Sequence, residues 1–125
     1  SLVAVVPVGH LWTKRGAVKF DELGDEHLIL RERGSITRSL IENEFQTRGK
    51  TPRSVIEMEG RESVREAVAA GIGIGFVSEP EFGYDSRLAM IQIEDCDLRM
   101  RESMVCLEAR FGTRTVGAFW ESAVD

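Results

Sequence analysis

The sequence predicts an α/β domain, specifically a three-layer sandwich with a mostly parallel central sheet, and three observations predict it. The run LVAVVPV from Leu2 to Val8 is almost entirely apolar and β-branched, as in a strand that is buried on both faces. Later apolar runs alternate with segments of helical periodicity, which is typical of strand–helix–strand units. The length of 125 residues suits one domain with one core.

The first half of the chain supplies two strands and one helix. Residues 9–26 are polar and interrupted by glycines, which predicts a surface loop, and Leu28–Glu32 predicts a second strand. Residues 35–49 predict a helix that ends at Gly49. The apolar residues that place this helix against the core are Ile36, Leu40, Ile41 and Phe45.

The second half continues the alternation. Val55–Met58 predicts a strand, residues 61–71 predict a helix, and Ile72–Ser78 predicts a buried strand whose glycines permit close approach of another backbone or of a ligand. An irregular stretch, residues 79–87, follows. The remaining expected elements are strands from Leu88 to Ile93 and over residues 103–109, and a final helix over residues 113–125.

Composition excludes several classes of function. The net charge of −5 opposes DNA binding by this segment alone, because such binding requires a basic surface. Cys96 and Cys106 lack a second thiol or a histidine pair nearby, so we expect reduced thiols, no metal and a cytoplasmic protein. No apolar run approaches the ~20 residues of a membrane-spanning helix.

The sequence contains no constellation typical of catalysis. His10 and His27 fall in early loops without a nucleophile that spacing would place beside them. Acidic neighbours and an apolar strand would raise the thiol pKa values of Cys96 and Cys106. We therefore expect neither an enzyme nor a bound cofactor.

The segment GSITR, Gly34 to Arg38, joins a strand end to a helix start at the rim of the predicted sheet. Free N–H groups and the positive end of a helix dipole attract anions there. Ser35 and Thr37 add hydroxyl donors, and Arg38 can add a guanidinium if it turns back over the helix start. Alternatively, Ser35 is an ordinary N-cap, and the two roles are compatible.

A second helix start, Glu59 to Glu62, lies on the same expected rim. Its carboxylates would repel an anion unless the positive charge of Arg61 offsets them. The alternative interpretation of this segment is a solvated charged turn, in which Arg61 is solvated as well. The glycines of GIGIG lack the spacing and the following helix of a dinucleotide fingerprint.

Taken together, LILRERGSITRSLIE and ESVREAVAAGIGIGFVSE resemble the effector-binding domain of LysR-type transcriptional regulators. The resemblance covers nearly the whole chain and corresponds to the second regulatory subdomain of that family. One departure is the irregular stretch with Pro80 and Gly83, where the family usually has a helix.

The resemblance implies a periplasmic-binding-protein-like (type 2) fold of two lobes with the effector bound between them. Residues 1–125 would then be a single fragment of it: the second subdomain, the crossing strand and the C-terminal helix, without the DNA-binding domain and the first lobe. By position, Ser35, Ile36 and Thr37 match the family's effector contacts, and Gly60 and Ser78 match less closely. The candidate effector-binding residues are therefore Ser35, Ile36, Thr37, Arg38, Gly60 and Ser78.

The expected function is that of a sensor, in which a small anionic metabolite modulates DNA binding by the full-length regulator. The resemblance also implies self-association, and DNA contact only through a separate N-terminal domain. The alternative is a lobe of a solute-binding protein of a transport system, because the two classes share this fold.

Overall fold

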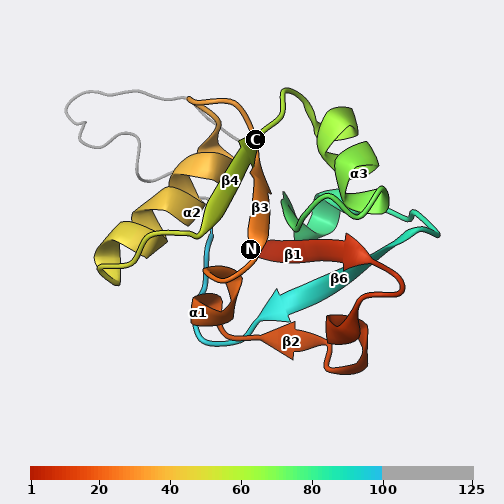
Figure 1. Ribbon diagram of the computed structural model, residues 1–125, viewed down its shortest axis with the longest axis horizontal. Helices are drawn as coiled ribbons and strands as arrows, with labels where there is room; N and C mark the ends of the chain where they lie inside the picture. Colours follow the sequence, from red (N-terminus) through yellow and green to blue (C-terminus); the bar gives the residue numbers. More distant parts are fainter. Residues whose placement is uncertain (100–125) are drawn as a thin grey trace.

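The computed structural model describes residues 1–99 (Figure 1). The predicted strand over residues 103–109 and the predicted helix over residues 113–125 lie outside them. The elements are, in order, β1 (Leu2–Pro7), η1 (Leu11–Lys14), β2 (Ala17–Val18), α1 (Phe20–Leu23), β3 (His27–Leu30), α2 (Ile36–Thr47), β4 (Ser54–Glu57), α3 (Arg61–Ala69), β5 (Gly75–Ser78), η2 (Glu79–Glu81) and β6 (Leu88–Ile93).

The strands form a four-stranded sheet of order β2-β6-β1-β5 and a two-stranded sheet of β3 and β4. Strand β1 is antiparallel to both of its neighbours, whereas the β2–β6 and β3–β4 pairs are parallel. A parallel bridge between Leu28 and Ile74 joins the two sheets, with Ile29 donating its N–H to the Ile74 carbonyl at 2.8 Å. The predicted α/β class and the central position of the first strand are confirmed. The prediction of mostly parallel pairing is wrong for the four-stranded sheet, because β1 runs antiparallel to β5 and β6 and an apolar run indicates burial, not strand direction.

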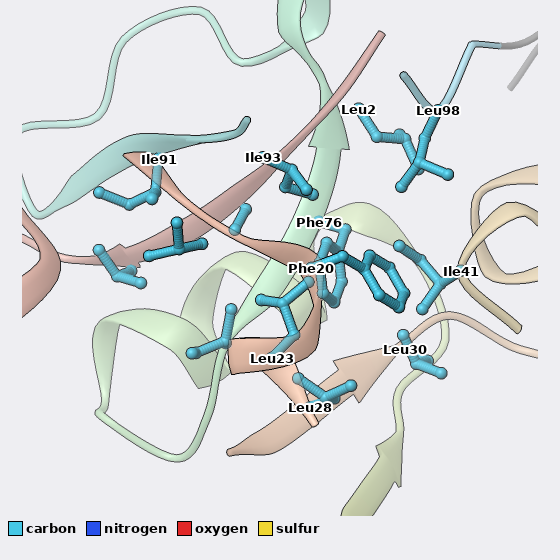
Figure 2. Packing of buried hydrophobic residues seen from close by; sticks show 14 of the residues in the cluster. Leu2, Phe20, Leu23, Leu28, Leu30, Ile41, Phe76, Ile91, Ile93 and Leu98 are labelled. Atoms are coloured by element: carbon cyan, nitrogen blue, oxygen red, sulfur yellow. The ribbon is translucent and has the colours of Figure 1, made fainter. Parts of the chain in front are cut away.

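Two hydrophobic cores lie on opposite faces of β1, because neighbouring residues of a strand point to opposite sides. Ala4 and Val6 belong to the larger core, with α1 and α2, whereas Val5 belongs to the smaller core, with α3. Figure 2 shows the larger core, in which Phe20 and Ile41 are fully buried. Helices on both faces of the sheet make the three layers that the sequence predicted.

The prediction of a surface loop over residues 9–26 is wrong. This segment contains η1, β2 and α1, and it buries Trp12, Val18, Phe20 and Leu23. Its apolar residues are separated by charged ones, so neither strand nor helix periodicity extends over a full window. Tertiary contacts fix it instead: Phe20 donates its N–H to Asp95 at 2.8 Å, and β2 pairs with β6.

Helix α2 is confirmed, but its buried face is not wholly the predicted one. Ile41 and Phe45 are buried as expected, whereas Ile36 and Leu40 are half-buried. Thr37 and Arg38 are buried in their place. Two polar side chains are therefore enclosed at the first turn of this helix.

Within residues 1–99, no helix is long and apolar enough to cross a membrane.

Gly73 and Gly75 allow the close packing expected of the glycine-rich strand. A Cβ atom at residue 73 would lie 2.6 Å from the His27 carbonyl oxygen, and one at residue 75 would lie 2.9 Å from methyl groups of Val64 and Val68. The backbone at residue 73 thus approaches β3 directly, and residue 75 approaches α3.

We predict that Gly73→Ala lowers the free energy of unfolding by about 1–3 kcal/mol, because the His27 carbonyl belongs to the backbone and must shift to admit a methyl group. Urea denaturation of the two proteins measures the difference. Gly9→Ala is the matched control, since nothing lies within 4 Å of a Cβ at that position. Equal losses in the two variants would contradict the packing argument.

Candidate functional site

The start of α2 is capped by Ser35, as the alternative interpretation of GSITR predicted. The Ser35 hydroxyl accepts a hydrogen bond from the Arg38 N–H at 3.3 Å, and its side chain is buried. The helix runs for 12 residues from this cap, so the positive end of its dipole lies at the rim beside the end of β3. This capping role leaves the proposed role of the helix start in anion binding open.

A pocket lies between α2, α3 and the end of β5. It brings together Thr37 and Ser78, which the sequence predicted as site residues, and three arginines, Arg31, Arg61 and Arg65. Thr37 and Ser78 are each more than nine-tenths buried. The rest of the lining is apolar apart from Glu81, and consists of Val5, Val64, Val68, Phe76, Val77, Phe82 and Leu88.

The cavity inside this pocket is small, with a volume of about 30 Å³. The residues that line it nevertheless combine the two features of a site for an organic anion: arginine and hydroxyl groups beside an apolar floor.

Arg38 does not line this pocket. Its guanidinium donates to Glu42 at 2.8 Å, to Glu57 at 2.8 Å and to the Arg31 carbonyl at 2.9 Å. The hydrogen bond to Glu42 is the main reason why the pKa of Arg38 is raised. These contacts join α2 to the ends of β3 and β4, and they favour a structural role for Arg38 over contact with an effector.

Gly60 and Ile36 also lie outside the pocket lining. Gly60 precedes α3 with a φ of +84°, a conformation that favours glycine, and donates its N–H to Glu32 at 3.3 Å. Glu32 accepts two further hydrogen bonds from Arg31, at 3.1 and 3.0 Å. Gly60 therefore helps to hold the two rim loops together, and its contact with an effector stays a prediction.

Sequence reasoning missed Arg31, Arg65 and Phe82 as pocket residues. Arg31 directly follows β3, whereas the predicted strand, Leu28–Glu32, included it and so hid its position on the rim. Arg61 and Arg65 are four residues apart on α3 and therefore share a helix face. Nothing in the sequence pattern places Phe82, because it belongs to the irregular stretch after β5.

The structure describes His10 and Cys96, two of the groups considered for catalysis or metal binding. His10 caps η1 by accepting a hydrogen bond from the Trp12 N–H at Nδ1, at 3.0 Å, which is a structural role. Burial is the main cause that raises the pKa of the Cys96 thiol to about 11, so the direction agrees with the prediction, whereas the acidic neighbours expected to cause it have a smaller effect. Cys106 lies outside the described residues. Within residues 1–99, no three His, Cys, Asp or Glu side chains form a possible metal site.

Comparison with known sequences matches the whole chain to one family. The family model described as LysR substrate binding domain matches residues 1–125. The chain is 30% identical over 123 residues to the RuBisCO operon transcriptional regulator of Allochromatium vinosum, covering 96% of this chain and 41% of that protein. It is also 30% identical to the HTH-type transcriptional regulator CbbR of Rhodospirillum rubrum, covering 87% and 37%. The chain thus spans about two fifths of the length of these relatives.

Solved structures show the same fold. The effector binding domain of BenM with its effector benzoate superposes with a TM-score of 0.69 at 22% identity, covering 78% of this chain and 46% of that one. The regulatory domain of Synechocystis CcmR in complex with 2-PG gives a TM-score of 0.65 at 29% identity, covering 74% and 46%. The expected periplasmic-binding-protein-like fold is confirmed.

The linkage between the rim loops gives a titration prediction for Glu32. Hydrogen bonds lower the pKa of Glu32 from 4.5 to about 2, and the bond from Arg31 has the largest effect. A lowered pKa stabilises the fold above pH 4.5, and the contribution is lost as the pH falls through about 2. NMR titration of the Glu32 side chain should give this value, and Arg31→Gln should raise it. A pKa near 4.5 in the unchanged protein would contradict the linkage.

Proposed function

The chain belongs to the family of LysR substrate-binding domains, and on this premise we propose that it senses a small anionic metabolite through the pocket between Thr37 and Ser78. The observation that carries the proposal is the arrangement of three arginines and two buried hydroxyl residues around one pocket. Arginine forks and hydroxyl groups are well suited to carboxylate or phosphate oxygens.

The charge of the pocket contrasts with that of the chain. The chain carries a net charge of −5, yet Arg31, Arg61 and Arg65 outnumber the single carboxylate, Glu81, in the pocket lining. The start of α2 adds the positive end of a helix dipole beside Thr37. Carboxylates offset part of the arginine charge, because Arg31 pairs with Glu32 at 3.0 Å, Arg61 with Glu81 at 3.5 Å and Arg65 with Asp85 at 3.8 Å. The arginine and hydroxyl donors together with the start of α2 favour an anionic ligand.

The relatives support a regulatory role. The two curated proteins named above are transcriptional regulators, and CcmR was solved with the small molecule 2-PG. The full protein would bind DNA through a domain outside this chain and would enclose the effector with a first lobe. An effector with unequal affinity for two lobe arrangements would then shift the protein between two states of DNA binding.

The rest of the proposal follows from this role. We propose that the full protein works in the cytoplasm, associates with further copies of itself and catalyses no reaction. The alternative, a lobe of a solute-binding protein for transport, finds no support among the relatives named above, because they are regulators. The shared fold alone would not have separated the two functions.

The experiment that tests this function is a calorimetric titration of the full-length protein with 2-PG, benzoate and inorganic phosphate, followed by DNA binding with and without the ligand that binds. A sensor should bind at least one of these anions and change its affinity for DNA in response. Binding of none of them, or binding without any effect on DNA affinity, would contradict the proposal.

We predict that Thr37→Val weakens binding of the active anion by about five- to tenfold, because a hydrogen-bonding hydroxyl in the pocket lining is replaced by a methyl group. Calorimetry of both proteins measures the loss, and circular dichroism checks that the fold is intact. Ser39→Ala is the control, since Ser39 is exposed on the same helix. Unchanged affinity of the Thr37 variant would remove this residue from the site.

A further inference from the structure

Residues 79–85, which belong to the irregular stretch after β5, form one wall of the pocket. This segment consists of η2 and the residues that follow it, and it contributes Glu81 and Phe82 to the pocket lining. Phe82 is buried and packs in the smaller core with Val64 and Val68 of α3. The position of this segment therefore decides the shape of the pocket.

Arg65 of α3 holds the segment at several points. Its guanidinium donates to the Phe82 carbonyl at 2.5 Å and to the Glu81 carbonyl at 3.4 Å. The same guanidinium lies over the Phe82 ring, 5.6 Å from the ring centre, and 3.8 Å from the Asp85 carboxylate. One side chain thus contacts backbone, ring and carboxylate of the segment.

The chemistry of these contacts requires arginine. A planar guanidinium can donate to two carbonyl oxygens and stack on an aromatic ring at the same time, whereas a lysine ammonium is a compact point charge. The Arg65 side chain is only 24% exposed, so neighbouring groups restrict it to this geometry.

We propose that Arg65 is a positioning residue of the effector pocket, which fixes the Phe82 wall by clamping the 79–85 segment onto α3. The inference rests on the proposed function, because it assigns the clamp a role in anion binding. Arg65 acts on the ligand through Phe82, and its positive charge alone does not perform this role.

Arg87 provides a matched comparison, because it holds the outer end of the same segment without lining the pocket. It pairs with Glu66 at 3.0 Å and with Asp85 at 2.9 Å, and its side chain is 47% exposed. Loss of Arg87 removes surface ion pairs from this segment but leaves the contacts of Phe82 in place.

The first test follows hydrogen exchange of residues 79–87 in the full-length protein without any ligand. Arg65→Lys should increase exchange of this segment by about tenfold, because the backbone contacts are lost, and Arg87→Gln should change it by less than about twofold. Exchange that is unchanged in the Arg65 variant, or equal in the two variants, would overturn the clamp. This experiment tests the clamp whether or not the protein binds an anion.

The second test measures the affinity for 2-PG, or for benzoate or phosphate if the wild-type protein binds one of these instead. Arg65→Lys and Phe82→Leu should each weaken binding by about tenfold, and the double variant should lose no more than about twofold beyond the larger single loss, because both act on one wall. Arg87→Gln should bind normally. Melting temperatures check that each variant folds.

The possible outcomes separate the two proposals. Wild-type protein that binds none of the anions would contradict the proposed function, while the exchange experiment would still judge the clamp. Normal binding by Arg65→Lys would show that a positive charge suffices, and multiplied losses in the double variant would show that the two residues act independently. Either result would overturn the role of Arg65 as a positioning residue.

Discussion

Burial of β1 on both faces is the constraint on which the rest of the structure depends. Residues 2–6 are each at most 5% exposed; Leu2, Ala4 and Val6 enter the larger core and Val5 enters the smaller one. The strand also pairs on both edges, so that Ala4 lies opposite Phe76 of β5 and Ile91 of β6. Val5, on the face toward α3, forms part of the pocket lining. The sheet, the cores and the candidate site therefore share one strand.

Three arginines, Arg38, Arg48 and Arg65, hold separate parts of the fold together and also carry positive charge. Arg38 joins α2 to the ends of β3 and β4, and Arg48 lies 5.0 Å from the Phe20 ring centre while pairing with Glu44. Arg65 holds the 79–85 segment in the same manner. Because each guanidinium has several donors, one residue can connect several elements and still contribute positive potential to a pocket.

Much of the fold and part of the site could be predicted from the sequence. Continuous apolar runs identified β1 and β5, and helical periodicity identified α2 and α3. The signal for each of these elements lies within its own residues. The residues 9–26 could not be interpreted in this way, since Trp12 and Phe20 are buried by contacts with distant strands. Thr37 and Ser78, which line the pocket, were among the predicted candidates because the start of α2 and the end of β5 were expected on one rim. Arg65 and Phe82 were missed because only tertiary packing brings them together.

The most direct test of the account is a crystal structure of the full-length protein with whichever of 2-PG, benzoate or phosphate it binds. The account predicts that the anion lies within hydrogen-bonding distance of Thr37, against the pocket lined by Ser78 and Phe82. An anion bound at a surface that excludes these residues would contradict the assignment of the site. It would leave the family and the fold unchanged.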